Sequence, residues 1–381
     1  MEQIKSYIAD NTIYLFILAA AAILATILWA HYFIFQTIVL FLGLANQAVL
    51  KILKAAFILL PLSFILASIL IHYSFNAVVR FYYTLSAVWL GLALYLFSAC
   101  LLIYLILFLA KPLSLKLNAK ILTLALLAAA VAVTIYGLTQ AQNIKIKKLE
   151  LALPNLPASW QNKTAVWISD LHLGAIENYE FSRRVAKLIE GLRPDVLFIG
   201  GDFYDGQKNI NLTELAEIFS GLEVPLGKFF ITGNHEEYAN KADFLKAIGD
   251  SGIVYLNNQL VDLDGLQIIG VDYGTAYSRK NFAAILANLK IDRSKPSILL
   301  RHVPDKIDVA SQFGISLMLC GHAHKGQLFP IQYIEALLYN GFHSGLKKIG
   351  QTLVYTSSGT GTWGPPMRIL ADPEIVEIKF K

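Results

Sequence analysis

Residues 165–174 have the sequence Ala-Val-Trp-Ile-Ser-Asp-Leu-His-Leu-Gly, in which an apolar run ends just before Asp170 and His172. The run has the length of one buried strand, so the two polar side chains follow the point where that strand ends. Four further polar motifs follow apolar runs in the same way: Gly201-Asp202-Phe-Tyr-Asp205, Gly233-Asn234-His235-Glu236, Arg301-His302 and Gly321-His322-Ala-His324. Open α/β sheets assemble their sites at strand ends, so these motifs are expected to form one site.

The segments between the motifs predict an α/β architecture. Strand-length apolar runs occupy residues 165–168, 196–199, 228–231, 298–300 and 317–320. Helical spacing of apolar residues fits residues 179–192 and 281–289, which lie between those runs. Residues 144–151 alternate as a half-exposed strand does, so we predict a catalytic domain over residues 143–381.

The N-terminal third predicts a membrane domain. Residues 13–30, 52–72, 81–110 and 121–139 are apolar stretches that can cross a hydrocarbon core, at about 20 helical residues per crossing. Residues 37–50 are also apolar but contain Asn46 and Gln47, which leaves an interfacial helix, a re-entrant piece or a fifth span open. We therefore predict about four transmembrane helices within residues 1–142 of a multi-pass cell-membrane protein.

The charge distribution separates the two parts of the chain. Residues 1–140 contain seven of the 32 basic and two of the 27 acidic residues, so the net charge of +5 arises there. The rest is balanced and has no basic stripe, so no nucleic-acid partner is expected. The spans have no acidic or basic residue near their middle, which disfavours a transporter. The basic loop 111–120 favours the cytoplasm, which predicts an extracytoplasmic catalytic domain.

The donors in the five motifs predict two metal ions. Carboxylates, imidazoles and the amide carbonyl of Asn234 suit zinc, iron or manganese. Seven candidate ligands are too many for one ion with an open position, whereas two ions that share a carboxylate would use them all. Two ions roughly 3.5 to 4 Å apart generate hydroxide near neutral pH and stabilise in-line displacement at phosphorus. Phosphoester hydrolysis is the expected reaction.

With these motifs the chain resembles the calcineurin-like metallophosphoesterases, and in particular their bacterial membrane-associated branch. The matching motifs, in order and spacing, are SDLHLG at 169–174, GGDFYDG at 200–206, GNHE at 233–236, RHVP at 301–304 and GHAHKGQ at 321–327. Residues 355–368, YTSSGTGTWGPPMR, resemble the C-terminal region of that branch. The resemblance covers roughly residues 150–381 and implies an α/β/β/α sandwich behind an N-terminal transmembrane helix bundle.

The resemblance also implies a role for each motif residue. One metal would be held by Asp170, His172 and His324, the other by Asn234, His302 and His322, with Asp202 as the bridge. His235 would be the catalytic histidine that is not a ligand, and Asp205 would orient it and favour its protonated form. Manganese is the expected metal, with iron or zinc as alternatives.

Departures from the family restrict the substrate. Gly206 stands where the protein phosphatases of this superfamily have Arg, which disfavours a phosphoprotein substrate. Candidate phosphate-binding cations are then Arg301, Lys325 and Arg368. The aromatic and apolar segment 329–342 is either core packing or, if it is exposed, a patch suited to acyl chains or to the bilayer surface.

Together these features predict a lipid-linked or cell-envelope phosphoester or pyrophosphate as the substrate, with the lipid bilayer as partner. Two alternatives remain open. One is a phosphodiesterase that acts on soluble nucleotides, and the other is a non-catalytic membrane receptor or scaffold that binds metal.

Overall fold

The computed structural model describes residues 2–207, 210–238 and 241–381. The chain divides into two compact units. The first comprises Met1–Leu70 and Leu85–Ile135, and the second comprises Ile71–Thr84 and Tyr136–Lys381. The second unit therefore takes in the link between two predicted membrane helices, in addition to the whole of residues 143–381.

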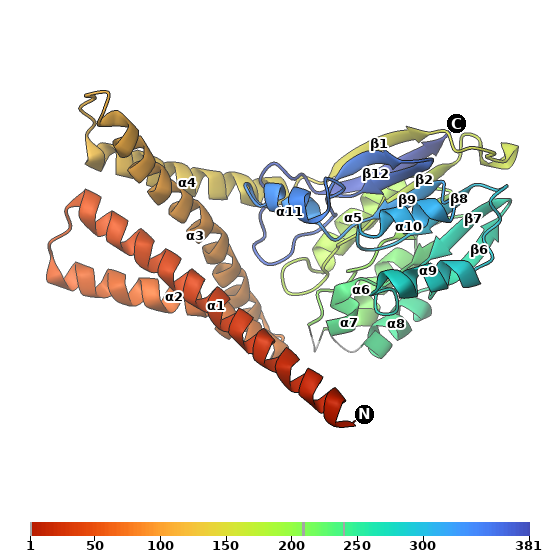
Figure 1. Ribbon diagram of the computed structural model, residues 1–381, viewed down its shortest axis with the longest axis horizontal. Coiled ribbons are helices and arrows are strands. Elements are labelled where there is room, and N and C mark those ends of the chain that lie inside the picture. Colours follow the sequence, from red (N-terminus) through yellow and green to blue (C-terminus); the bar gives the residue numbers. More distant parts are fainter. Residues whose placement is uncertain (1, 208–209, 239–240) are drawn as a thin grey trace. The chain divides into compact units, whose positions relative to one another are not determined.

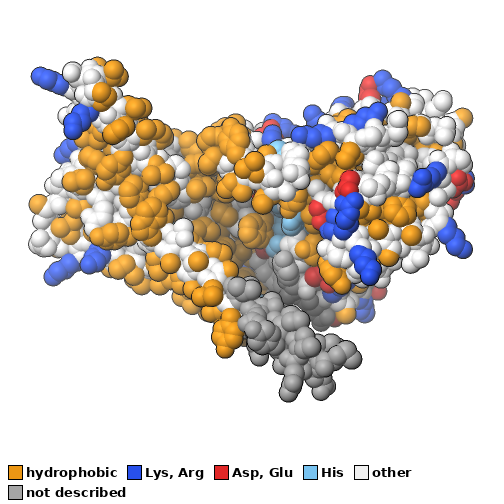
Figure 2. Space-filling model, in the orientation of Figure 1, with side chains coloured by type: hydrophobic (Ala, Val, Ile, Leu, Met, Phe, Trp, Pro, Cys, Tyr) orange, Lys and Arg blue, Asp and Glu red, His pale blue; other side chains and the backbone are white. Residues whose placement is uncertain are grey.

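Four long helices form the N-terminal part of the chain (Figure 1): α1 (Glu2–Leu42), α2 (Gln47–Tyr73), α3 (Ala77–Ala110) and α4 (Ala119–Ala141). Each is long and apolar enough to cross a membrane. Figure 2 shows hydrophobic side chains over most of the visible surface of these helices. The four predicted spans are confirmed as helices of spanning length.

Residues 37–50 complete α1 and begin α2, so the described part of the chain has no separate fifth helix there. Gly43 adopts a φ of 66°, which ends α1 in the left-handed conformation that glycine favours. The Asn46 side chain then accepts hydrogen bonds from the backbone N–H groups of Ala48 and Val49 and caps α2.

His31 lies inside the apolar part of α1 rather than near its end, because α1 continues to Leu42. Its Nδ1 is 2.8 Å from the carbonyl oxygen of Ile27, and its Nε2 accepts a hydrogen bond from Trp89 Nε1 at 3.1 Å. Both ring nitrogens are thus bonded within the bundle, as a structural histidine requires.

The domain formed by residues 143–381 contains two six-stranded sheets. The first has the order β1-β12-β2-β3-β4-β5, with β1 (Lys145–Leu151), β12 (Glu374–Phe380), β2 (Thr164–Ile168), β3 (Val196–Ile199), β4 (Lys228–Phe230) and β5 (Val254–Tyr255). The second has the order β10-β11-β9-β8-β7-β6, with β10 (Gly345–Ile349), β11 (Thr352–Thr356), β9 (Leu317–Cys320), β8 (Ser297–Leu300), β7 (Leu266–Gly270) and β6 (Gln259–Leu263).

Helices cover the outer face of each sheet. Helices α5 (Tyr179–Leu192), α6 (Leu212–Ser220) and α8 (Lys241–Asp250) share a hydrophobic core with the first sheet. Helices α9 (Arg279–Asn288) and α10 (Ile307–Gln312) share another with the second sheet. The shorter α7 (Asn234–Tyr238) and α11 (Gln332–Leu338), and the 3-10 turns η1 (Ala158–Trp160) and η2 (His324–Gly326), complete the domain.

A third core lies between the sheets and explains the continuous apolar runs. In β2, Trp167 belongs to the core that both sheets share, whereas Val166 and Ile168 pack under the helices. Strands buried on both faces lose the alternation of polar and apolar residues. The α/β/β/α sandwich is confirmed, and the domain's central strands are parallel: β2 with β3 and β4, and β7 with β8 and β9.

Candidate metal centre

The five motifs begin where parallel strands end, and backbone hydrogen bonds join their loops. The N–H of His172 donates to the carbonyl of Asp202 at 3.0 Å, and the N–H of Gly321 donates to the carbonyl of His302 at 2.9 Å. Two bonds connect the sheets. His302 Nδ1 lies 2.8 Å from the carbonyl oxygen of Gly200, and the N–H of His322 donates to Asp170 Oδ1 at 2.9 Å. The predicted convergence of the motifs is therefore observed.

One group of ligand-type side chains consists of Asp170, His172 and His324, all buried. The Nε2 atoms of His172 and His324 are 3.0 Å apart. His324 Nε2 is 3.6 Å from Asp170 Oδ1. These are the three residues that sequence analysis assigned to the first metal.

A second group consists of Asp202, His302 and His322, with Asn234 beside it. His302 Nε2 is 3.2 Å from Asn234 Oδ1 and 3.2 Å from His322 Nδ1. Asp202 Oδ2 lies 3.2 Å from His302 Nε2 and 3.9 Å from His172 Nε2. A single carboxylate oxygen therefore faces both groups, which is the position that the predicted bridging ligand requires.

The donor atoms fit a pair of cations. Asp170 Oδ2 is buried and has no hydrogen-bond partner among the described residues. Two pairs of imidazole nitrogens, at 3.0 and 3.2 Å, face each other. Facing nitrogens at these distances need a proton or a cation between them, and a buried carboxylate oxygen needs a partner. Carboxylate, imidazole and amide oxygen together match zinc, iron and manganese.

Five of the seven candidate ligands have a positive φ, between 46° and 68°: Asp170, His172, Asp202, His322 and His324. This conformation is uncommon outside glycine and costs free energy. It persists only where the surrounding structure holds it, and such positions cluster at functional sites. Glycines provide the space around the ligands. A Cβ at Gly233 would meet Asp202 Oδ1 at 2.1 Å, and one at Gly321 would meet Asp170 Oδ2 at 2.3 Å. The glycines of the motifs thus let the backbone approach the carboxylates.

Electrostatic interactions separate the protonation states of the second group. Burial lowers the pKa of His302, but Asp202 and Asp170 raise it to about 9. Burial and the charge of His302 lower the pKa of His322 to about 3. Burial opposes ionisation of Asp202, yet His302 holds the pKa of this carboxyl well below its usual range. Asp202 is therefore ionised and His322 neutral, as metal ligands must be, and cation binding would displace the proton of His302.

His235 lies at the edge of the first group. Its Nδ1 is 3.2 Å from the backbone oxygen of Asp205 and 3.5 Å from Asp205 Oδ1. The same carboxylate oxygen is 3.3 Å from His172 Nδ1, so Asp205 serves two histidines rather than His235 alone. Burial, followed by the charge of His172, lowers the pKa of His235 despite the neighbouring carboxylates. Asp205 thus contacts His235 and favours its protonated form as predicted, but burial and the charge of His172 outweigh this effect.

Glu236 has a structural role that sequence analysis did not assign. Its buried carboxylate accepts hydrogen bonds from the backbone N–H groups of Asp202, Phe203, Tyr204 and Gly233, at 2.6 to 3.3 Å. It therefore joins the loop after β3 to the loop after β4. An acidic residue in the same motif as the candidate ligand Asn234 was the available signal.

Gln207 is a second missed residue. Its Nε2 donates to Asp205 Oδ2 at 2.8 Å, and its Oε1 accepts from the backbone N–H of Ala175 at 2.7 Å. The carbonyl of Ala175 accepts in turn from Arg80 Nε, at 3.3 Å. Arg80 belongs to the Ile71–Thr84 segment of the same compact unit. A chain of polar contacts thus connects that segment to the carboxylate beside His235.

Two of the three candidate phosphate-binding cations are buried and bonded to other groups of the protein. Arg368 is buried and donates to the carbonyls of His324, Ser358 and Gly361, and its Nη2 lies 3.1 Å from His324 Nδ1. It therefore supports His324 rather than facing a substrate. Arg301 is also buried, pairs with Asp305 and lies 4.5 Å above the Phe282 ring. Lys325 is half-buried and has no such partners within the described chain.

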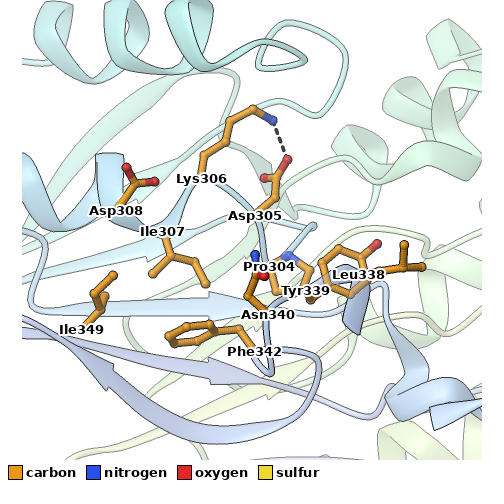
Figure 3. A pocket seen from close by; sticks show the side chains of 10 residues that line it. All are labelled: Pro304, Asp305, Lys306, Ile307, Asp308, Leu338, Tyr339, Asn340, Phe342 and Ile349. Carbon is orange, nitrogen blue, oxygen red and sulfur yellow. Dashed lines mark hydrogen bonds and ion pairs between the residues drawn. The ribbon is translucent and has the colours of Figure 1, made fainter. Parts of the chain in front are cut away.

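A pocket of about 290 Å³ lies beside the second group of ligands (Figure 3). Residues 304–308, which follow His302, form one side of it, and Leu338, Tyr339, Asn340, Phe342 and Ile349 form the rest. The Tyr339 ring is 6.2 Å from the His322 ring. Figure 3 shows Lys306 paired with Asp305, both directed away from the apolar side chains of the lining. The pocket combines charged and apolar groups next to the ligands.

Comparisons with known proteins show which family the chain resembles. Residues 164–326 fit the model of the calcineurin-like phosphoesterase family. An uncharacterized metallophosphoesterase of Aquifex aeolicus is 32% identical over 65% of this chain and 95% of its own length. A metallophosphoesterase of Helicobacter pylori strain J99 is 32% identical over 62% of this chain, and a transmembrane protein with metallophosphoesterase domain of Danio rerio is 35% identical over 68%. The chain spans 64% and 62% of the length of those two relatives.

Proposed function

We propose, from the premise that this chain belongs to the calcineurin-like metallophosphoesterases, that it hydrolyses a phosphoester or pyrophosphate bond of a lipid-linked or cell-envelope substrate. Membership of the family makes the chain a metal-dependent phosphoesterase, and its four apolar helices make it a membrane protein. The position of Asp202 Oδ2 between the two groups of ligands carries the proposal of a two-metal mechanism.

Each side chain has a defined part in that mechanism. Asp170, His172 and His324 would hold one divalent ion, Asn234, His302 and His322 the other, and Asp202 would contact both. When bound, two such ions activate water and stabilise the charge that develops at phosphorus. Manganese is the proposed metal, with iron or zinc as alternatives. His235, placed at the edge of the ligands, would stabilise or protonate the leaving oxygen, and Asp205 orients its ring.

Two features support a lipid-linked substrate. The membrane helices attach the catalytic domain to the bilayer through the chain itself, and α11, in the apolar segment after the last motif, has no buried residue. Tyr333, Ile334, Leu337 and Leu338 are all more than half exposed in that segment. We propose that the catalytic domain lies outside the cytoplasm, because the basic loop 111–120 favours the cytoplasmic side of the membrane.

The experiment compares wild type with Asp202→Asn in manganese-supplemented hydrolysis of a chromogenic phosphodiester, with the bound metal counted for each. Loss of the bridging charge should lower the rate by about 100-fold or more and reduce the metal content. Equal activity of the two proteins would refute the two-metal mechanism, whereas no activity in either would leave a metal-binding receptor or scaffold as the function.

The substrate class is tested separately with matched phosphoesters that have or lack acyl chains, in mixed micelles. The lipid-linked forms should be hydrolysed faster. If acyl chains have no effect and soluble nucleotides are hydrolysed equally well, the chain is a soluble-substrate phosphodiesterase attached to a membrane.

A further inference from the structure

Helix α11 presents its apolar side chains to the outside. Tyr333, Ile334, Leu337 and Leu338 are 57 to 81% exposed, and they recur with the spacing that places residues on one face of a helix. The polar Gln332 and Glu335 are only half-exposed. A surface helix in water has the reverse arrangement, so this face is built to meet an apolar medium.

A second exposed segment is hydrogen-bonded to the chain that leads into α11. Trp363 and Leu370 are 58 and 59% exposed. Gln327 joins this segment to the chain that leads into α11. Its side chain accepts from the N–H of Trp363 and donates to the carbonyls of Trp363 and Pro365, and its backbone carbonyl accepts from Ile369. We call the six exposed side chains of these two segments the apolar collar: Tyr333, Ile334, Leu337, Leu338, Trp363 and Leu370.

The collar is attached to the last turns of a membrane helix. The backbone N–H of Arg368 donates to the carbonyl of Gly137 in α4 at 3.0 Å. The packing is close, because a Cβ at Gly137 would meet Ile369 Cδ1 at 2.7 Å. Gln142, just beyond α4, accepts a hydrogen bond from Arg184 of α5 at 2.9 Å. The end of a membrane helix lies at the bilayer interface, so the segment bonded to it lies there as well.

We propose that the apolar collar inserts into the interfacial layer of the bilayer that the chain's own helices span. Its composition fits that layer, where Trp and Tyr concentrate and where an amphipathic helix buries its apolar face among headgroups and upper acyl chains. Tyr339 connects α11 to the ligands, because its ring is 6.2 Å from that of His322. The catalytic consequence of this inference rests on the proposed function. If the substrate is a lipid, it would enter the site from the layer in which the collar lies.

Insertion can be measured without any hydrolysis. Leu337→Cys in the full-length protein is labelled with an environment-sensitive fluorophore, reconstituted in nanodiscs and quenched with lipids brominated in the upper acyl chain. Lys280→Cys, exposed on α9, is the matched control. Both native cysteines, Cys100 and Cys320, are buried, so wild type treated with the same reagent measures the background. Quenching at Leu337 should exceed that at Lys280 several-fold.

Two results would overturn the proposal. Equal quenching by brominated lipid at both positions means that the collar faces water. Soluble iodide, added as a second quencher, tests the remaining case. If neither iodide nor brominated lipid quenches the fluorophore on Leu337→Cys, protein covers the collar, either a second copy of the chain or another partner.

A second variant tests the catalytic consequence. Ile334→Asp/Leu337→Asp changes exposed residues and should lower hydrolysis of a bilayer-embedded phosphoester by about tenfold, because a charged face leaves the interface. Hydrolysis of a soluble chromogenic diester should be unchanged. Tyr277→Asp, an exposed aromatic residue elsewhere in the domain, is the control. If the collar inserts but no lipid-linked ester is hydrolysed, the collar stands and the proposed substrate is wrong.

Discussion

At the scale of single residues, Glu177 makes the free energy of unfolding of the protein depend on pH. It is buried and accepts a hydrogen bond from Thr362 at 2.6 Å. Burial raises its pKa to about 7, from an ordinary value of 4.5, although Thr362 acts in the opposite direction. A raised pKa of an acid favours the protonated form in the folded chain. The stability that this carboxyl contributes is therefore complete below pH 4.5 and lost as the pH rises towards 7.

Glu177→Gln should remove that dependence, because the amide cannot ionise. The variant should match wild type near pH 4.5 and become more stable than wild type as the pH rises to 7, by up to about 3 kcal/mol. Thermal unfolding of both purified proteins between pH 4.5 and 8 measures the difference. A difference that stays constant with pH would show that Glu177 keeps its ordinary pKa.

Gly233 provides a second test at this scale. Gly233→Ala places a methyl group against Asp202 Oδ1, so the carboxylate must move. We expect metal affinity to fall by about tenfold or more, as measured by metal titration, because the ligand geometry is displaced. Gly191→Ala in α5 is the matched control, since nothing lies within 4 Å of its added Cβ. That change should stabilise the protein by about 0.5 to 1 kcal/mol.

At the scale of elements, Gln207 in the loop after β3 holds Asp205, the proposed orienting residue of His235. Gln207→Ala removes the donor to Asp205 and the acceptor for Ala175. We expect kcat to fall by about tenfold with little change in KM, because His235 loses its orientation while the ligands remain. Gln207→Glu retains the acceptor but repels Asp205, so its kcat should also fall. A normal kcat in both variants would leave Asp205 positioned by other contacts.

The elements themselves follow closely from sequence patterns. β3, β9 and α5 have the predicted bounds, and α9 differs by only a few residues. These segments carry strong local signals: apolar runs that are buried on both faces, or apolar spacing of a helix that follows a capping Asn178. The role of Arg368 has no such signal, because its partners at His324 and Gly361 are set by how distant loops pack.

At the scale of the whole molecule, the direction of insertion decides which substrates are available. The basic loop 111–120 predicts an extracytoplasmic catalytic domain. Lys280→Cys should therefore react with a membrane-impermeant maleimide added to intact cells, while wild type, whose two cysteines are buried, should not. Labelling that requires lysed cells would place the domain in the cytoplasm.

The sequence alone predicted which ligand-type side chains come together and the four helices of spanning length. Both depend on residue types at short spacing, since donors after apolar runs lie at strand ends and about 20 apolar residues cross a bilayer. Only the tertiary structure decided that the apolar side chains of α11 are exposed and that Arg368 supports His324. It also decided that Asp205 contacts two histidines and that Ile71–Thr84 belongs to the same compact unit as Tyr136–Lys381. Burial and pairing depend on which distant segments pack against a residue, and no local pattern of the chain records that.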